Sequence, residues 1–269
     1  MAEPARVPTV DVVVPAYNEV EVLRRTVTRL QAHLASTLDV PFVLTIAESG
    51  STDGTDLLAA ELAERLDGVR AVCDEQRGRG LAVRRAWESS DGDVVAYVDA
   101  DLSIGLDAFG PLLAPLLAGT ADLAVGSRHV RGARVRRSLH RAVLSRSLNL
   151  LLRVVLRTRF SDAQCGFKAA RRDVVLGVMD DVQADHWFFD TELLVVAQEQ
   201  GLRIHEVPVH CVDDPRSSVD LVPTVRSFLR DVVRLARARR DRAAGPPPAT
   251  AARPARHRTS GEVYVPPVT

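Results

Sequence analysis

The sequence predicts an α/β domain built on a mostly parallel sheet. Short apolar runs alternate with segments of helical periodicity over the first hundred residues, and polar, turn-rich clusters follow three of those runs. The chain has 269 residues, 46% of them hydrophobic, which is enough for the core of one such domain. In sheets of this kind the crossovers are right-handed, and ligands bind beyond the carboxyl ends of the strands.

Predicted strands and helices follow one another along the chain. Strands are expected at 10–14, 42–47, 69–73, 93–98 and 205–212, and helices at 20–34, 56–66, 81–89, 138–156, 190–200 and 219–238. Between them lie a basic connector at 128–137 and an irregular loop at 160–167. We expect an N-terminal extension at 1–8, the domain at 9–240, and a disordered tail rich in Pro, Ala and Arg at 241–269.

Two aspartates, Asp99 and Asp101, directly follow the apolar run at 93–98. When the chain bends at the end of a strand, carboxylates two residues apart can both reach one cation. Hard oxygen ligands suit Mg²⁺ or Mn²⁺, and such a cation would bridge a diphosphate and neutralise the leaving group. We therefore expect these two residues to bind Mg²⁺ or Mn²⁺.

Two more polar clusters are expected at the same edge of the sheet. The sequence PAYNE at 15–19 offers an aromatic ring and polar groups that suit a base and ribose, and Asn18 within it is also expected to cap the next helix. The sequence ESGSTDGT at 48–55 contains two glycines that allow close approach of the backbone to a nucleotide, with Asp53 or Thr55 as a second helix cap.

Cations are concentrated in two places. Arg77 and Arg79, in the sequence RGRG, precede a predicted helix and suit phosphate oxygens. From 128 to 172 there are 13 Lys or Arg residues and one acid, Asp162, so this segment carries a charge of +12 although the whole chain is neutral. A local excess of this size indicates an anionic partner, phosphate or a membrane surface, and the neutral total argues against nucleic acid.

Composition also bears on the location of the protein. The three cysteines have no framework spacing and fit reduced thiols in the cytoplasm. The N-terminus shows no signal peptide, and no apolar run reaches about 18 residues. We expect a cytoplasmic protein, peripheral at the inner face of the cytoplasmic membrane, held by the lipid surface or by a separate membrane protein.

In their order and spacing, five motifs resemble the GT-A domain of family 2 glycosyltransferases: VVVPAYNE, GSTDGT, RGRGLAVRRAW, VDADLS and GSRHVRGA. Two later segments, SDAQCGFKAARRDV and WFFDTELLVVAQEQGLRIHEVPV, resemble the polyprenyl-phosphate branch, which includes dolichyl-phosphate glucosyltransferases and dolichol-phosphate mannosyltransferases. The resemblance covers about residues 9–237. It implies a nucleotide-sugar donor, UDP-glucose or GDP-mannose, and a polyprenyl-phosphate acceptor.

The resemblance also implies a role for each matching position. Pro15, Tyr17 and Glu19 would contact the nucleoside, and Asp99 and Asp101 would hold the metal and diphosphate. The residues expected near the phosphates or on the acceptor side are Arg128, Lys168, Asp190 and Glu192. Two positions depart from the family pattern: Glu48 and Ser49 replace paired aspartates, and Arg216 stands upstream of a position that often holds a cation.

The expected reaction is an in-line displacement with inversion at the anomeric carbon. A phosphate acceptor, with a second pKa of about 6, is already largely an anion at neutral pH. Catalysis then depends on positioning and charge neutralisation, with Arg128, Lys168 and Arg131 or Arg134 at the acceptor phosphate and Asp101 at the metal.

Other functions stay open at this point. A family 2 enzyme acting on a sugar hydroxyl would need a general base, for which Asp190 is the candidate, although this residue also fits a helix N-cap. A non-catalytic nucleotide-sugar-binding module is a further alternative. The predicted helices 138–156 and 219–238 combine apolar stripes with arginines, so they either lie at a membrane surface or pack on the sheet.

Overall fold

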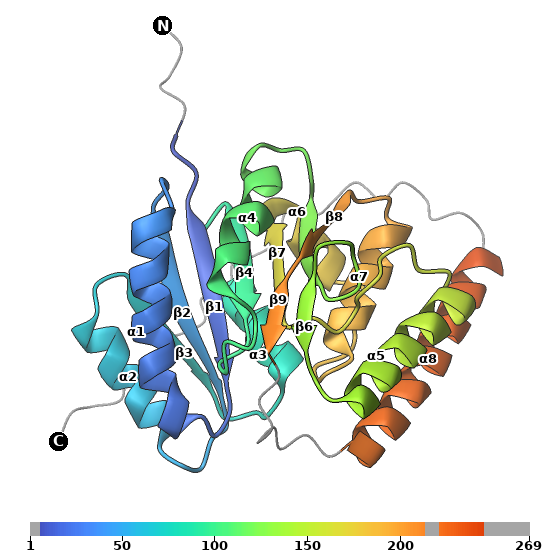
Figure 1. Cartoon of the computed structure of the whole chain (residues 1–269), viewed down its shortest axis with the longest axis horizontal. Coiled ribbons are helices and arrows are strands. Elements are labelled where there is room, and N and C mark those ends of the chain that lie inside the picture. Colours follow the sequence, from blue (N-terminus) through green and yellow to red (C-terminus); the bar gives the residue numbers. More distant parts are fainter. Residues whose placement is uncertain (1–5, 213–220, 245–269) are drawn as a thin grey trace, which may run out of the picture.

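The computed structural model describes residues 6–212 and 221–244 (Figure 1). Its strands are β1 (Val10–Ala16), β2 (Phe42–Ser49), β3 (Val69–Asp74), β4 (Val94–Val98), β5 (Leu123–Ser127), β6 (Arg134–Arg136), β7 (Phe167–Arg171), β8 (Ile204–Pro208) and β9 (His210–Val212). Its helices are α1 (Val20–Thr37), α2 (Thr55–Arg65), α3 (Arg79–Glu88), the 3-10 helix η1 (Leu106–Ala108), α4 (Phe109–Leu117), α5 (Leu139–Val155), α6 (Arg172–Met179), α7 (Phe189–Glu199) and α8 (Leu221–Ala244). The predicted α/β fold is confirmed.

Seven strands form one sheet in the order β3-β2-β1-β4-β7-β5-β8, and helices cover both of its faces (Figure 1). β6 and β9 form a separate two-stranded sheet. The chain passes from β1 outward through β2 to β3, and then returns to place β4 on the other side of β1, parallel to it. The strand order therefore reverses between β1 and β4, which is where open α/β sheets bind their ligands.

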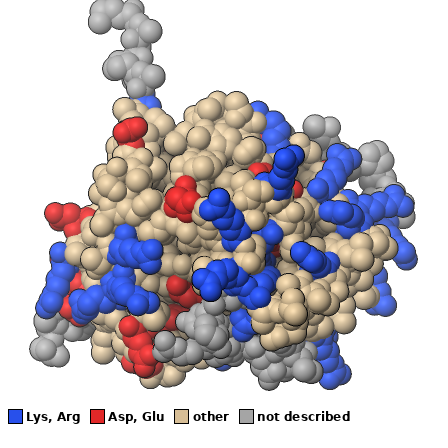
Figure 2. Space-filling model, viewed as in Figure 1, with Lys and Arg blue, Asp and Glu red and all other residues tan. Residues whose placement is uncertain are grey.

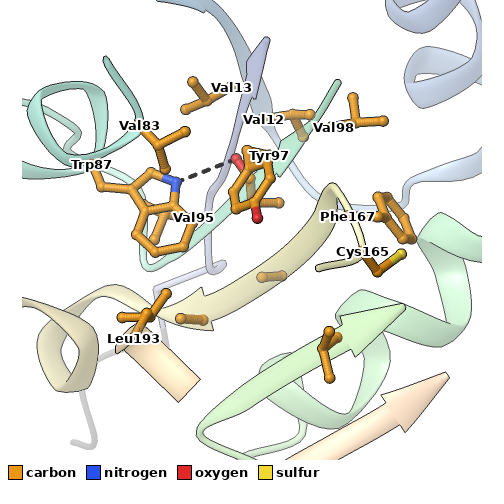
Figure 3. Close-up of a cluster of buried hydrophobic side chains, with 14 of the residues drawn as sticks. Val12, Val13, Val83, Trp87, Val95, Tyr97, Val98, Cys165, Phe167 and Leu193 are labelled. Atoms are coloured by element: carbon orange, nitrogen blue, oxygen red, sulfur yellow. Dashed lines mark hydrogen bonds between the residues drawn. The ribbon is translucent and has the colours of Figure 1, made fainter. Parts of the chain in front are cut away.

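The core lies on both sides of the central strands. Every residue of β4 and β5 is buried, as expected for strands covered by helices on both faces. Figure 3 shows one cluster, in which valines of β1 and β4 meet Trp87 of α3, Phe167 of β7 and Leu193 of α7. The indole Nε1 of Trp87 donates a hydrogen bond to the carbonyl of Ala96 at 3.3 Å, so this buried polar group is satisfied.

β7 is a feature that the sequence does not predict. It lies between β4 and β5 and is antiparallel to both, in a sheet whose other pairs are parallel. Its five residues, FKAAR, have a lysine at the second position, so they do not resemble a buried strand. The register places Lys168 opposite Tyr97 of β4.

Three other expectations change. The single strand expected at 205–212 is two strands in different sheets, because Pro208 ends β8 and the chain turns into β9. The connector at 128–137 contains β6, and β5, α4 and α6 were not foreseen. The last helix continues through Ala244, beyond the expected boundary at 240. Residues 1–5 and 245–269, where most of the predicted extension and tail fall, lie outside the described residues.

Candidate active site

Four carboxylates gather at the carboxyl end of the β1–β4 pair. Glu19 follows β1, Asp53 precedes α2, and Asp99 and Asp101 follow β4. Partial burial, together with the charges of Asp101, Asp99 and Asp53, raises the pKa of Glu19 to about 7. Burial also raises the pKa of Asp99, and its Arg79 partner only partly offsets this effect. The cluster is therefore short of positive charge, which is the condition for binding a cation.

Asp99 and Asp101 are held by the turn that follows β4. The hydroxyl of Thr26 donates to the carbonyl of Ala100 at 2.6 Å, and the backbone N–H of Ser103 donates to Asp101 Oδ1 at 2.9 Å. Asp101 is exposed, and the Asp99 side chain is 30% exposed. Two accessible oxygen donors fit Mg²⁺ or Mn²⁺. Among the described residues, no three His, Cys, Asp or Glu side chains are placed so that they could hold one metal ion, so water or oxygens of a bound diphosphate would supply the other ligands.

The loop after β1 and the loop after β2 are joined by hydrogen bonds. Asn18 Oδ1 accepts from the N–H of Thr52 at 2.9 Å, and Asp53 Oδ2 accepts from the N–H of Val20 at 3.2 Å. Asp53 Oδ1 also accepts from the N–H of Thr55 at 3.0 Å. The prediction that Asn18 caps α1 is wrong, since its side chain reaches the next loop and Asp53 reaches the first N–H of α1 instead. Both residues shape the expected nucleoside site.

The other predicted nucleoside residues occupy the same edge. Glu48 is buried, and its carboxylate accepts from the N–H of Ser51 at 2.6 Å, which closes the turn after β2; Ser49 is buried beside it. Pro15 lies near the end of β1. The exposed Arg77 guanidinium lies over the half-buried ring of Tyr17, 4.1 Å from its centroid. One face of the Tyr17 ring is therefore already covered by a cation.

Arg79 takes a different position from the expected phosphate ligand. Its side chain is 11% exposed and lies between two carboxylates. Nε and Nη2 both donate to Asp99 Oδ1, at 2.9 and 2.6 Å, and Nη1 donates to Asp190 Oδ2 at 2.7 Å. In this arrangement Arg79 connects the candidate metal ligand to α7 instead of facing a phosphate.

Asp190 and Lys168 are buried on the inner side of Arg79. Asp190 accepts hydrogen bonds from Arg79 and from the Tyr97 hydroxyl, and the Lys168 ammonium lies 3.2 Å from its Oδ1. Lys168 also donates to the carbonyls of Cys165 and Ala163, at 2.7 and 3.1 Å. Burial alone would raise the pKa of Asp190, but Arg79 and Lys168 hold it below its usual value.

These positions correct two expectations. Lys168 is 1% exposed and its three N–H groups have acceptors, so it supports Asp190 instead of contacting a phosphate. Asp190 is 1% exposed and its side chain makes no N-cap hydrogen bond to α7. Because it is ionised, buried and already paired, Asp190 is poorly suited to take a proton from a substrate.

The remaining predicted residues do not meet at one point. Both oxygens of the buried Asp162 accept from Arg128, with Nε at 2.7 Å and Nη2 at 2.8 Å, so Arg128 clamps two loops together. Glu192 is buried and pairs in the same bidentate way with Arg234 of α8, at 2.9 and 2.8 Å. Arg131 is exposed. Arg216 lies outside the described residues.

Sequence reasoning missed three residues of this site. Tyr97 hydrogen-bonds Asp190 from inside the core, where no sequence signal separates it from packing. Trp187 is 43% exposed, and its ring lies 4.8 Å from the Arg79 guanidinium. A Cβ on Gly166 would overlap Asp99 Oδ2, so this glycine makes room for the carboxylate. The sequence signal that could have identified Gly166 is its position in QCGFK, part of a segment that resembles the polyprenyl-phosphate branch.

We expect Gly166→Ala to weaken cation binding by Asp99 and Asp101. The added methyl would push the Asp99 carboxylate away from its present position, which is also fixed by the hydrogen bond from the N–H of Asp99 to the Gly166 carbonyl at 3.1 Å. The predicted result is at least tenfold weaker binding of Mn²⁺ in the presence of nucleotide, measured by electron paramagnetic resonance. Gly177→Ala is the matched control, because no atom lies within 4 Å of a Cβ at that helical position. Equal Mn²⁺ binding by both variants would contradict the assignment.

Solved structures with the same fold bind nucleotides. Glucosyl-3-phosphoglycerate synthase from Mycobacterium tuberculosis, in complex with uridine diphosphate, is 25% identical, with a TM-score of 0.62 over 86% of this chain and 80% of that one. The mannosyltransferase PcManGT from Pyrobaculum calidifontis, in complex with GDP-Man and Mn²⁺, is 21% identical, with a TM-score of 0.55 over 91% of this chain and 68% of that one. The architecture is thus that of the GT-A nucleotide-sugar transferases.

The family is shown by sequence. Residues 11–178 match glycosyl transferase family 2, and the chain belongs to this family. Glycosyltransferase AglD of Haloferax volcanii is 38% identical over 227 residues, 84% of this chain and 36% of AglD. Polyprenol monophosphomannose synthase of Mycolicibacterium smegmatis is 32% identical over 74% of this chain and 75% of that protein.

A dolichyl-phosphate beta-glucosyltransferase of Trichomonas vaginalis, ALG5C, is 30% identical over 73% of this chain. The chain spans 36% of the length of AglD and 62% of that of ALG5C. The family and fold expected from the sequence motifs are thereby confirmed.

Proposed function

We propose that this protein is an inverting, metal-dependent glycosyltransferase that moves a hexose from a nucleotide sugar, UDP-glucose or GDP-mannose, to a polyprenyl phosphate. Relatives named for dolichyl-phosphate glucosyl transfer and for polyprenol monophosphomannose synthesis support this acceptor class. Asp99 and Asp101 would hold Mg²⁺ or Mn²⁺, which neutralises the diphosphate leaving group when bound. Tyr17, Glu19 and the loop 48–55 would surround the nucleoside.

One structural observation carries the proposal of a phosphate acceptor: a basic strand pair lies beside the metal motif. The N–H of Val212 in β9 donates to the carbonyl of Ser103 at 2.9 Å, and the N–H of Gly105 donates to the carbonyl of His210 at 2.8 Å. β6 pairs with β9, which places Arg136 opposite Val212. Ser103 is two residues from Asp101, so the strand pair that carries the exposed arginines of β6 adjoins the loop of the proposed metal ligands.

This arrangement changes which residues are the best candidates for binding the acceptor phosphate. Arg128 and Lys168 are paired with Asp162 and Asp190, whereas Arg131, Arg134 and Arg136 are exposed. A guanidinium can bind phosphate oxygens through two N–H groups at once, which positions the nucleophile as well as neutralising it. We assign this role to Arg134 and Arg136, with Arg131 at the start of the same segment.

Asp190 is buried and ion-paired, so it is not a free base, and this also favours an acceptor that is already an anion. A sugar hydroxyl must lose its proton during transfer, and a buried, ion-paired carboxylate does not serve that step. Glu19, whose pKa is raised to about 7, lies with Asp53 on the side expected to hold the nucleoside. A sugar-hydroxyl acceptor would need a general base, and the Asp190 carboxylate of α7 is not placed to act as one.

The test is a panel of nucleotide sugars offered with radiolabelled polyprenyl phosphate and Mg²⁺ or Mn²⁺. We expect transfer from UDP-glucose or GDP-mannose to the lipid, and little transfer to soluble glycosides. Arg134→Ala combined with Arg136→Ala should raise KM for the lipid phosphate at least tenfold, with Arg159→Ala, an exposed arginine outside the β6 segment, as the control. Transfer to glycosides alone would support the hydroxyl alternative, and nucleotide binding without turnover would support a non-catalytic module.

A further inference from the structure

α5 carries an apolar face that the protein leaves open to solvent. Of its 17 residues, all within the described part of the chain, only Leu152 is buried. Leu139, Val143, Leu150 and Val154 are 85%, 63%, 61% and 70% exposed. They are spaced four, seven and four residues apart, so they lie on one side of the helix. Arg146 and Arg153, also exposed, border this side, and the helix has no acidic residue.

α8 lies beside α5 at one end of the molecule and adds further cations (Figure 1). Its exposed residues include Leu229 and Val233, interspersed with Arg226, Arg230, Arg237 and Arg240 at helical spacing. Figure 2 shows basic side chains crowded over this end of the molecule, with few acidic ones among them. No described helix is both long and apolar enough to cross a bilayer.

The two helices are connected to the candidate active site. Arg234 of α8 pairs with Glu192 of α7, one turn or less from Asp190. Asn149 of α5 accepts from the N–H of Ala163, in the loop that also bonds Lys168. α5 itself follows directly after β6 in the chain. A surface that contacted α5 would therefore lie beside the arginines of β6.

We propose that the exposed face of α5, bordered by the arginines of α5 and α8, is a docking surface for an anionic lipid bilayer. Packing on the sheet does not account for its apolar residues, because they are exposed. Apolar side chains flanked by arginines complement the acyl boundary and the negative headgroups of such a bilayer. The inference rests on the proposed function, since it identifies the surface from which the same site would take its lipid phosphate.

The test measures binding of the full chain to vesicles, without any transfer reaction. Phosphatidylcholine vesicles with phosphatidylglycerol should pellet the wild-type protein at low salt, and high salt should release it, because charge attraction is screened within about a Debye length. Leu139→Glu combined with Val143→Glu should weaken binding at least tenfold. Leu57→Glu is the matched control, since Leu57 is 70% exposed on α2, away from α5.

The contribution of the α8 arginines is tested by the same vesicle-binding measurement, with the double variant Arg226→Glu and Arg230→Glu. The control is the double variant Arg25→Glu and Arg29→Glu on α1. The α8 pair should lose binding and the α1 pair should keep it. Wild-type protein that stays in solution with anionic vesicles at low salt, or α5 variants that bind as well as wild type, would overturn the docking surface. A change of oligomeric state in the α5 variants without wild-type vesicle binding would assign the face to a second copy instead. Transfer to polyprenyl phosphate in detergent would show separately whether the proposed function stands.

Discussion

Asp101→Ala is expected to lower kcat/KM for glycosyl transfer roughly a thousandfold while leaving the fold intact. The carboxylate of Asp101 is exposed and its recorded bond is to the N–H of Ser103, so its removal costs little stability. Losing one of the two protein ligands of a cation that neutralises a leaving diphosphate should raise the barrier by about 4 kcal/mol.

The measurement is kcat/KM for the donor over a range of Mn²⁺ concentrations, with the thermal midpoint recorded for each variant. Asp91→Ala is the control, because Asp91 is exposed just before β4, at the opposite end of that strand. Its rate should match wild type. Full activity of Asp101→Ala, or of the wild-type enzyme in excess chelator, would rule out the metal role of this motif.

Breaking the buried ion cluster is expected to have the largest effect on stability. Asp190 lies between Arg79 and Lys168, and all three are nearly inaccessible to solvent. Asp190→Asn leaves two buried cations with one fewer anion, and Lys168→Met removes a cation from Asp190. Removing one partner of a buried ion pair costs about 3–5 kcal/mol of unfolding free energy. Urea denaturation of the single variants measures this cost.

The double variant Asp190→Asn with Lys168→Met gives a sharper test. It removes one charge of each sign, so its cost should be smaller than the sum of the two single costs. Asp173→Asn, which breaks the exposed pair with Arg171, is the control and should change stability by less than about 1 kcal/mol. Additive costs, or a loss of activity in Asp190→Asn with no loss of stability, would contradict the structural role and make a proton acceptor the better assignment.

The sequence predicts the first half of the fold well because the strands there are continuous apolar runs and the helices show apolar residues at helical spacing. The runs before Pro15 and Asp99 are continuous and apolar, and the polar cluster after each one can only lie at the carboxyl edge. β7 could not be predicted in this way. In the buried strand FKAAR, the carbonyls of Ala163 and Cys165 and the side chains of Tyr97 and Asp190 satisfy Lys168. The two carbonyls are local, but Tyr97 and Asp190 come from β4 and α7, which the sequence does not place beside Lys168.

The same limit applies to the site. Motif order and spacing predicted Asp99 and Asp101 as metal ligands, and the structure places both after β4, where the strand order of the sheet reverses. For Arg79, Arg128 and Glu192, sequence shows the charge but not the partner. Asp99, Asp162 and Arg234 neutralise them in the folded chain, and two of these partners are more than thirty residues away. Cations that remain exposed, such as Arg134 and Arg136, could be separated from the paired ones only in three dimensions.

The position of β7 also determines the order in which the chain can be assembled. In the described sheet, β5 has β7 and β8 as its neighbours, and neither exists until residue 167 has been synthesised. β1 to β4 are complete by Val98 and can pair at once, whereas β5 must wait about forty residues for a partner. A nascent chain halted before Phe167 would therefore hold one paired half-sheet and one apolar strand without strand partners, which is the kind of species that chaperones protect from aggregation.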